Sequence, residues 1–396
     1  MRLPRAWLRA AGLAAAGATA VACASTGTGA EAPSPSRTSS AAVSHAPITP
    51  TPQVSQAAGL SPAQLAGQRV IFSYAGQHPP AALLSLIAHG EVAGVIFFSG
   101  NVASADQLAG VIRQLDAAAA APANPVHAPL LLMTDQEGGP VRRLPGGPFQ
   151  SEKLVGQAAD PAAAARTAGM QAAANLRGIG LNMNLAPVLD VYRTPGDFDD
   201  QFGRSYSTDP KTVASLGADF ITAQQAGGVA ATAKHFPGLG TAAAKQNTDN
   251  EPVTLTASAA TLRAVDELPY PAAIAAGVKV IMASWAVYPA LDPGRPAGLS
   301  ARIVGGELRG RLGFTGVTIT DALEAKALTA YGAISHRALL AAQAGMDLIL
   351  CSAQSLTEGT ECLSGLEGGY GSGALPKDGF EAAAARVIAL RASLAH

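Results

Sequence analysis

Eight short apolar segments alternate with alanine-rich segments of helical pattern from residue 60 onward, and this alternation constrains the fold more than any other feature. The predicted strands are residues 69–73, 93–98, 130–134, 181–185, 229–233, 279–283, 316–320 and 346–350. Most are nearly continuous apolar runs, which is typical of parallel strands covered on both faces. Helices are predicted between them, at 105–119, 160–177, 210–226, 258–276 and 333–344 among others. This order predicts the α/β class and a single-domain (β/α)8 barrel of the TIM type.

An open, doubly wound sheet is the alternative for the same pattern. Such sheets usually have a glycine-rich phosphate-binding loop after the first strand, and none follows Ser73. A chain of 396 residues with 48% hydrophobic residues suits one large barrel core. Charged residues make up 14% and the net charge is −1, so nucleic acid is not an expected partner.

The first 23 residues are predicted to be an export signal outside the folded domain. Arginines within the first nine residues precede a small apolar stretch, 10–22, which is too short to span a bilayer comfortably. The stretch ends in Ala-Val-Ala-Cys23, which resembles a bacterial lipobox. This resemblance implies a lipid on Cys23 and anchoring at the outer face of the cell membrane. An ordinary secretory signal followed by a chance cysteine is the alternative.

Residues 24–58 are rich in Ser, Thr, Pro and Ala and have no apolar period. This composition buries too little apolar surface to offset the conformational entropy of ordering the chain. We therefore expect a disordered linker, followed by the barrel domain at 59–396.

Two further cysteines, Cys351 and Cys362, lie near the end of the chain. A disulfide between them is possible in an exported protein, but their spacing does not establish it. A metal site is not expected there, because nothing nearby supplies ligands at metal spacing.

Polar residues follow the ends of the predicted strands. They are Asp135, Gln136 and Glu137 after the third strand, Asp190 and Arg204 after the fourth, Lys234 and His235 after the fifth, Ser284 after the sixth, and Asp321 after the seventh. The carboxyl ends of barrel strands converge on the face that holds binding sites. A charge at the end of an apolar strand is costly unless it faces a wet cleft. We therefore expect these side chains to share one cleft.

Structural roles remain open for the same residues. Asp321 is either a nucleophile or acid/base in the barrel mouth, or the N-cap of the following helix. Lys234 and His235 either bind ligand hydroxyls, or they are an ion-paired lysine and a core histidine bonded to backbone.

Two loops allow similar alternatives. The segment 135–139 either lets a ligand approach its two glycines closely or forms a tight turn with solvated acids. In the long loop after the fourth strand, most charges, including Asp199 and Asp200, are expected to be solvated. Arg204 is the exception, because its planar guanidinium suits hydroxyl and carboxylate partners.

Several motifs occur in a fixed order along the predicted barrel. They include Asp-Gln-Glu-Gly-Gly (135–139), Asn-Leu-Ala-Pro-Val-Leu-Asp-Val (184–191), Gly-Arg-Ser-Tyr (203–206), Lys-His-Phe-Pro-Gly (234–238) and Gly-Phe-Thr-Gly-Val-Thr-Ile-Thr-Asp (313–321). From about residue 60 to the end, the chain resembles glycoside hydrolase family 3. It is most similar to the single-domain bacterial β-N-acetylhexosaminidases that trim cell-wall fragments.

This resemblance implies a retaining glycosidase with Asp321 as the nucleophile that forms a covalent glycosyl-enzyme. It implies that Asp135, Arg204, Lys234 and His235 hold the hydroxyls of the terminal sugar. The expected activity is that of an exo-β-N-acetylglucosaminidase on β-linked N-acetylglucosamine of peptidoglycan, without a metal or organic cofactor. The alternatives are a β-glucosidase or glycoside phosphorylase on the same fold, or a sugar-binding lipoprotein that has lost turnover.

The chain departs from the resembled hexosaminidases at the acid/base. Theirs is a histidine on the loop after the Lys-His-Phe-Pro-Gly motif, whereas the 239–251 loop of this chain has no histidine. If Asn247-Thr248-Asp249 occupies that place, Asp249 is the expected acid/base, and Glu251 is the next candidate. Desolvation by a closed loop would raise the pKa of such a carboxyl and keep it protonated near neutral pH. The alternative is that both acids are solvated loop residues.

Two other positions differ from the resembled pattern. Pro140 stands where an arginine is usual, and Trp285 stands where a histidine is common. These differences bear on the acid/base and on specificity more than on the fold.

Overall fold

The structure is a computed structural model that describes residues 57–394. The predicted export signal, Cys23 and the predicted linker up to residue 56 lie outside the described residues. Ala57 is buried in the same hydrophobic cluster as the barrel strands. None of the helices between residues 57 and 394 has the length and apolar character needed to cross a membrane.

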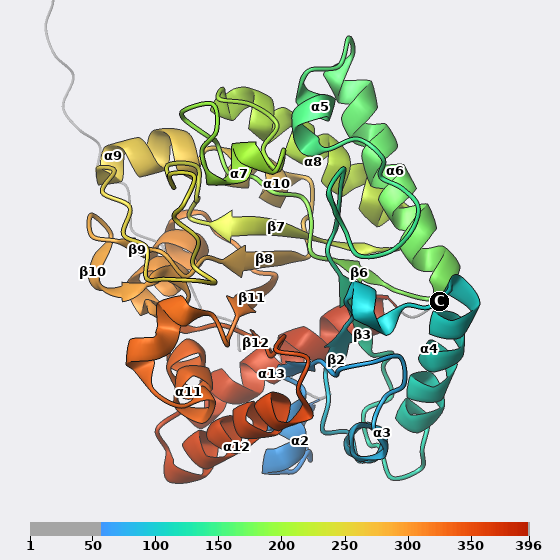
Figure 1. Cartoon of the computed structure of the whole chain (residues 1–396). Coiled ribbons are helices and arrows are strands. Elements are labelled where there is room, and N and C mark those ends of the chain that lie inside the picture. The colour runs from blue at the N-terminus through green and yellow to red at the C-terminus, as the bar shows by residue number, and fades with distance from the viewer. Residues whose placement is uncertain (1–56, 395–396) are drawn as a thin grey trace, which may run out of the picture. The chain divides into compact units, whose positions relative to one another are not determined.

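Eight parallel strands form a closed barrel (Figure 1). They are β1 (Val70–Phe72), β2 (Gly94–Ile96), β3 (Leu131–Thr134), β6 (Met183–Asn184), β7 (Ala230–Phe236), β8 (Val280–Ala283), β11 (Val317–Ala322) and β12 (Leu348–Leu350). Each strand pairs with the next in this order, and β12 closes the barrel by pairing with β1. Each overlaps one predicted strand, so the predicted barrel is confirmed and the doubly wound alternative is wrong.

Helices follow the strands and surround the barrel (Figure 1). The main ones are α2 (Pro62–Gly67), α3 (Ala81–Ala88), α4 (Ala105–Ala119), α6 (Pro161–Ile179), α8 (Pro210–Ala226), α11 (Ile334–Ala344), α12 (Leu356–Ser372) and α13 (Lys377–Ser393). Helices α4 and α8 have the predicted bounds. The start of α8 follows from local sequence, since Asp209 caps the free N–H groups of Lys211 and Thr212 while Pro210 occupies the first helical position.

The helix predicted at 258–276 is interrupted. The structure has a short α9 (Ala259–Thr261), a π-helical turn η2 (Leu262–Asp266) and α10 (Pro269–Ala275). Proline has no N–H and its ring clashes with the preceding turn of a helix, so Pro269 begins a helix here instead of continuing one.

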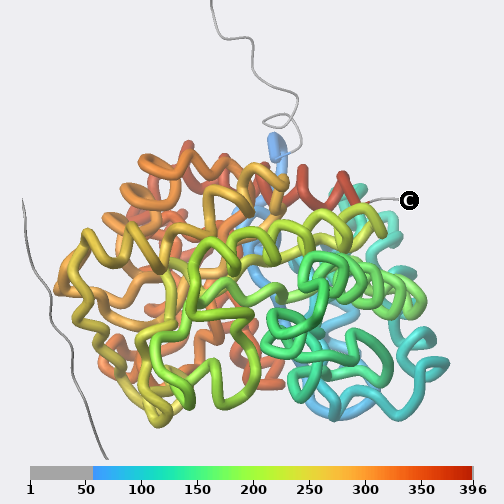
Figure 2. Tube along the Cα trace, turned by 90° about the horizontal axis from the view of Figure 1, so that it is seen from above, coloured from blue at the N-terminus to red at the C-terminus, as the bar shows by residue number. Residues whose placement is uncertain are grey.

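Helix α13 covers the end of the barrel where the strands begin. Its residues Val387 and Leu390 belong to the hydrophobic cluster that fills the barrel interior. The guanidinium of Arg391 donates to the carbonyls of Ala128 and Pro129, which precede β3. The first described helix, α2, packs beside α13 (Figure 2). With this end covered, the barrel is open to solvent at the carboxyl ends of its strands.

Two strands extend further than predicted. Strand β7 continues through Lys234 and His235 to Phe236, which pairs with β8 after a register shift. Strand β11 includes Asp321 and ends at Ala322, again after a register shift against β12. The polar residues therefore lie within the strand ends rather than after them. Such irregularities bend strand ends beside active sites and re-aim side chains.

Short elements decorate the open end of the barrel. Strand β4 (Gln136–Gly138) pairs with β5 (Val141–Arg142), and β9 (Val287–Tyr288) pairs with β10 (Asp292–Pro296). Cys351, which follows β12, forms a disulfide with Cys362 in α12. The disulfide links the last barrel strand to its covering helix.

Candidate active site

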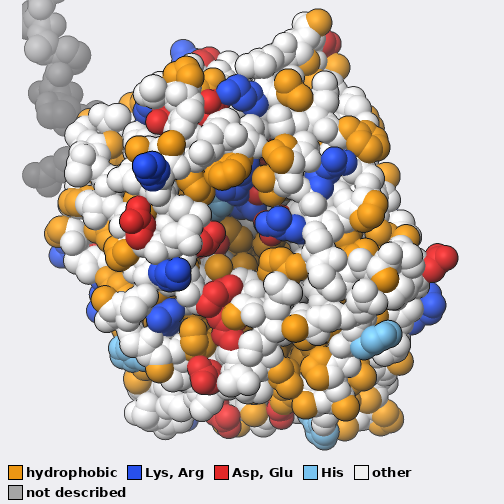
Figure 3. All heavy atoms as spheres, in the orientation of Figure 1, with side chains coloured by type: hydrophobic (Ala, Val, Ile, Leu, Met, Phe, Trp, Pro, Cys, Tyr) orange, Lys and Arg blue, Asp and Glu red, His pale blue; other side chains and the backbone are white. Residues whose placement is uncertain are grey.

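A cavity of about 500 Å³ lies at the carboxyl ends of the strands. It is lined by all the predicted site residues of the barrel: Asp135, Arg204, Lys234, His235, Asp249 and Asp321. In the space-filling view, acidic and basic side chains gather around a hollow in this face (Figure 3). The expectation of one shared cleft is correct for these residues. It is wrong for Gln136, Asp190 and Ser284, which are fully buried and do not line the cavity.

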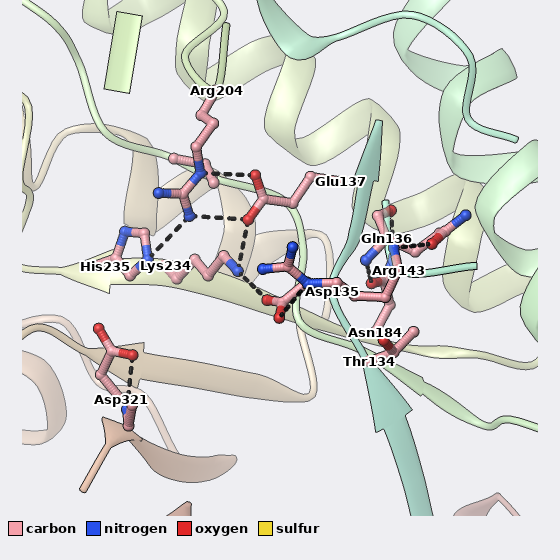
Figure 4. A network of polar contacts seen from close by, with 12 residues as sticks. Thr134, Asp135, Gln136, Glu137, Arg143, Asn184, Arg204, Lys234, His235 and Asp321 are labelled. Atoms are coloured by element: carbon pink, nitrogen blue, oxygen red, sulfur yellow. Dashed lines mark hydrogen bonds and ion pairs between the residues drawn. The ribbon is translucent and has the colours of Figure 1, made fainter. Parts of the chain in front are cut away.

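Lys234 connects two carboxylates from the β3–β4 segment. Its Nζ lies 2.9 Å from Oδ1 of Asp135 and 2.7 Å from Oε1 of Glu137 (Figure 4). Burial alone would lower the pKa of Lys234, but Asp135 and Glu137 raise it above its ordinary value, so the ammonium stays charged. The ion-paired lysine and the pocket-lining lysine, which the sequence left as alternatives, are the same residue.

Arg204 is held in one orientation by Glu137. Its Nε and Nη2 donate to the two carboxylate oxygens at 2.9 Å each, and its Nη1 donates to Asp199 at 3.3 Å (Figure 4). Burial alone would raise the pKa of Glu137, but the charges of Arg204 and Lys234 hold it well below its usual range. A bidentate pair of this kind fixes both distance and plane. The guanidinium is therefore presented to the pocket in a fixed position.

His235 is oriented from behind by Asp190. Its Nδ1 lies 2.7 Å from Oδ2 of Asp190, while Oδ1 of Asp190 accepts from the backbone N–H of Leu239 at 2.6 Å. Burial, reinforced by the charge of Arg204, lowers the pKa of His235 to about 4, so the ring is neutral at pH 7. Its Nε2 then carries a lone pair and faces Nη2 of Arg204 at 3.4 Å.

The loop before Arg204 differs from its prediction. Asp199 and Asp200 are buried rather than solvated, with 1% and 4% of their surfaces exposed. Asp199 contacts Arg204, and Asp200 forms an ion pair of 2.6 Å with Lys153. Burial and the charge of Asp190 raise the pKa of Asp199 to about 7. Both acids belong to the support of the site.

Asp321 lies across the pocket from this cluster, on β11 (Figure 4). Its Oδ1 accepts from the N–H of Ala322 at 2.7 Å, and it forms no ion pair with any residue in the described part of the chain. The helix N-cap interpretation is wrong, because the next helical turn, η5 (Lys326–Tyr331), has Ala325 as its N-cap. Burial raises the pKa of Asp321, and the charge of Asp249 raises it further, whereas His235 lowers it.

The two acids of the 239–251 loop occupy different environments. Both side chains are exposed, but Asp249 lines the pocket and Glu251 lies outside it. Backbone bonds attach this part of the loop to the chain after β11, since Lys326 N–H donates to the carbonyl of Asp249 and Ala327 N–H donates to that of Thr248, both at 3.1 Å. Although part of its side chain contacts solvent, loss of water at the pocket wall raises the pKa of Asp249.

Comparison with known proteins identifies the family of the chain. Residues 63–390 match the family described as the glycosyl hydrolase family 3 N-terminal domain. The chain belongs to glycosyl hydrolase family 3. It is therefore a glycoside hydrolase.

Three similar proteins place this family 3 hydrolase among its relatives. An uncharacterized secreted glycosyl hydrolase from Arthroderma benhamiae is 44% identical over 83% of this chain and 93% of its own length. A β-hexosaminidase from Xanthomonas oryzae is 35% identical over 78% and 94%. The solved family 3 β-N-acetylglucosaminidase from Paenibacillus sp. superposes with a TM-score of 0.79 at 33% identity, covering 85% of this chain and 63% of the other.

Four residues of this family 3 site were not assigned a role from the sequence. Glu137 holds Arg204 and Asp190 holds His235 by hydrogen bonds. Arg143 and Glu324 line the pocket. Glu137 lies within the Asp-Gln-Glu-Gly-Gly motif and Asp190 within 184–191, so both were visible as motif members. Neither motif shows that the partner of Glu137 is Arg204, 67 residues away.

Three side chains of the family 3 hydrolase that could act as metal ligands lie close together. Ligand atoms of Asp190, Asp199 and His235 are within 4.8 Å of one another. Asp190 is already bonded to His235 and to the Leu239 N–H, and the guanidinium of Arg204 contacts both Asp199 and His235. A fixed cation at this distance disfavours a second one, so hydrogen bonding accounts for the cluster.

Proposed function

We propose that this family 3 hydrolase is a retaining exo-β-N-acetylglucosaminidase with Asp321 as its nucleophile. The observation that carries the proposal is an unpaired carboxylate on β11 that faces a fixed polar cluster, Asp135, Arg204, Lys234 and His235, across one cavity. The names of the Xanthomonas and Paenibacillus relatives support the N-acetylglucosamine specificity. A cavity of about 500 Å³ is large enough for a terminal sugar and part of its neighbour.

The polar cluster would bind the terminal sugar. Lys234 and Arg204 donate to ring hydroxyls, Asp135 accepts from them, and neutral His235 offers Nε2 as an acceptor. Because Glu137 and Asp190 already fix these side chains, little side-chain entropy is lost when the sugar binds. The cluster thereby sets the position of C1 relative to Asp321.

The reaction would proceed in two steps. An Asp321 oxygen attacks C1, the glycosidic C1–O bond breaks, and Asp249 gives its proton to the leaving oxygen. Water then attacks C1 and Asp249 takes one of its protons, while the Asp321–C1 bond breaks and the configuration at C1 is retained. An acid with a raised pKa can hold the proton needed for the first step near neutral pH.

The predicted export signal supports a substrate outside the cytoplasm. We propose that the enzyme trims peptidoglycan-derived sugars and is attached to the outer face of the membrane through a lipid on Cys23. The secreted Arthroderma relative supports export. A Cys23→Ala variant should be absent from the membrane fraction or remain unprocessed. Globomycin-sensitive processing and membrane retention in that variant would refute the lipid anchor and leave the enzymatic proposal intact.

The decisive experiment measures hydrolysis of 4-nitrophenyl glycosides by the pure protein. We expect release from the β-N-acetylglucosaminide, little from the β-glucoside, and no stimulation by phosphate. Preference for the glucoside, dependence on phosphate, or binding without turnover would each replace the proposed activity with another.

Two variants separate the proposed catalytic roles. Asp321→Ala should lose activity on every substrate, and azide should restore some turnover with inverted product. Asp249→Asn should still release nitrophenolate in the first step, because that leaving group needs no proton, whereas its slow second step should be accelerated by azide to a retained β-glycosyl azide. Wild-type cleavage of N,N′-diacetylchitobiose by Asp249→Asn would show that Asp249 is not the acid/base.

A further inference from the structure

Glu324 is a second acid of the pocket wall, close in sequence to the nucleophile. Its Oε1 accepts from Oγ of Ser352 at 2.8 Å, and its Oε2 faces the Ser352 N–H at 3.4 Å. The hydroxyl and the backbone N–H of Ser352 therefore fix the position of the Glu324 carboxyl group in the wall. Ser352, which follows β12, thus holds the carboxyl group of Glu324 while this group lines the cavity.

The loop bearing Asp249 is fixed to the same wall. The two backbone bonds from Lys326 and Ala327 to Asp249 and Thr248 join the loop to the chain immediately after Glu324. Asp249 and Glu324 therefore approach the cavity from adjoining segments whose backbones are bonded to each other.

The carboxyl group of Asp249 has no hydrogen-bond or ion-pair partner within residues 57–394. Besides Glu324, the charged groups that act on it are Arg204, Lys234 and Asp135, and it acts in turn on Asp321. Loss of water around the carboxyl group raises the pKa of Asp249. The charges of Glu324 and Asp135 raise this pKa further, whereas those of Arg204 and Lys234 lower it.

Glu358 lies behind Glu324, at the start of α12, and is 5% exposed. Its Oε2 accepts from the N–H of Ala353 at 2.8 Å, and its Oε1 has no hydrogen-bond partner in the described chain. Burial and the adjacent charge of Glu324 raise the pKa of Glu358 to about 8. A pKa of about 8 means that Glu358 is largely protonated at neutral pH.

We propose that Glu324 is a positioning residue for proton transfer: its carboxyl group, held by Ser352 in the same cavity wall as Asp249, keeps the proton on Asp249 until the leaving sugar accepts it. The proposal rests on the proposed role of Asp249 as the acid/base. Glu324 acts on the proton through charge and does not itself contact the reacting atoms.

The pH dependence of turnover follows from this arrangement. Cleavage of a natural disaccharide needs protonated Asp249, so its alkaline limb reports the loss of that proton. Without the charge of Glu324 the pKa of Asp249 falls, and the alkaline limb moves to lower pH. Release of nitrophenolate needs no proton and is insensitive to the change in the first step.

The test compares the pH profiles of kcat/KM for N,N′-diacetylchitobiose and the 4-nitrophenyl β-N-acetylglucosaminide in the wild type and Glu324→Gln. With the disaccharide we expect the variant to lose about tenfold at pH 8, equivalent to one unit of pKa, and to lie within about twofold of the wild type at pH 5. With the nitrophenyl substrate we expect about twofold or less at both pH values, which also shows that the variant is folded.

Two controls isolate the charge. Glu324→Asp retains the carboxylate and should move the alkaline limb back toward the wild type. Glu251→Gln removes a charge from the same loop outside the pocket and should leave the profile unchanged. A Glu324→Asp profile identical to that of Glu324→Gln, or an equal shift in Glu251→Gln, would overturn the proposal.

Failure of this inference is distinguishable from failure of the function. If Asp249→Asn loses the disaccharide but Glu324→Gln leaves the alkaline limb in place, only the role of Glu324 is refuted. If Asp249→Asn cleaves the disaccharide normally, the acid/base assignment fails and the inference fails with it. Loss of the disaccharide at all pH values in Glu324→Gln alone would identify Glu324 as the acid and overturn its positioning role.

Discussion

The indole Nε1 of Trp285 donates a 2.7 Å hydrogen bond to the carbonyl of Ala322, the residue that follows Asp321. The indole is fully buried, and its ring lies so close to Gly298 that a Cβ on that glycine would come within 2.5 Å of it. Trp285 thus fixes the end of β11 from the segment that follows the neighbouring strand β8. Trp285, which departs from the resembled pattern, therefore supports the backbone next to the proposed nucleophile.

Replacing Trp285 with phenylalanine keeps an aromatic ring but removes the donor. The carbonyl of Ala322 would lose its partner at a cost of about 1–3 kcal/mol, and the end of β11 would be less constrained. We expect kcat on the nitrophenyl substrate to fall about tenfold with little change in KM, because the residues proposed to bind the sugar lie on other segments of the chain. A rise in KM with unchanged kcat would contradict this. Tyr331→Phe, which removes an exposed hydroxyl–carbonyl contact, is the matched control.

Lys234→Ala and Arg204→Ala should each weaken binding of N-acetylglucosamine. A lost hydrogen bond to a charged group costs about 1.5–3 kcal/mol, which corresponds to roughly 10–150-fold in Kd. Calorimetric titration with the sugar measures this directly. Arg166→Ala should bind normally, because the ion pair of Arg166 with Asp219 lies outside the pocket. Native affinity in both pocket variants would remove these residues from the site.

The barrel was predictable because its strands are nearly continuous apolar runs and because strand and helix alternate without a gap. The ends of β7 and β11 were not, since backbone pairing continues past the point where the side chains become polar. The interruption of the helix predicted at 258–276 depends on Pro269. Its effect can be read from the sequence, because proline has no backbone N–H to donate within a helix. Apolar periodicity alone overestimates the continuity of that helix.

The site was predictable to the extent that barrel geometry brings strand ends together. Most of the expected residues share one cavity, yet the pairing among them depends on tertiary distance. The sequence contains no signal that Asp199 is buried or that Glu137 bonds Arg204, because each interaction depends on how the long loop after β6 folds back over the barrel. Loop charges were therefore predicted to be solvated, and this was the main error.

Glu137 neutralises both cations, so its replacement should be more damaging than the removal of either cation. In Glu137→Gln, Arg204 loses its bidentate partner and Lys234 keeps only Asp135. Breaking a buried ion pair on one side typically costs about 3–5 kcal/mol. We expect a lower Tm together with a higher KM, measured by calorimetry and by steady-state kinetics. A variant of unchanged Tm would show that the cations do not depend on Glu137 for their burial.

Asp199 predicts how stability depends on pH. Burial and the charge of Asp190 raise the pKa of Asp199 to about 7, against an ordinary value of 3.8. The folded state therefore binds this proton more tightly than the unfolded state, so the resulting stabilisation is complete below the ordinary pKa and is lost as the pH rises through 7. Asparagine keeps the oxygen that accepts from Arg204 but cannot ionise. We expect the Tm of Asp199→Asn relative to the wild type to rise between pH 5 and pH 8 by at least about 2–4 °C, equivalent to roughly 1 kcal/mol.

Asp209→Asn is the control for this prediction. Asp209 is exposed, and hydrogen bonds from the first turn of α8 lower its pKa, so the Tm of this variant relative to the wild type should be constant over this range. A constant difference for Asp199→Asn as well would mean that Asp199 is already ionised at pH 5, and its charge would then have to be balanced by Arg204 throughout.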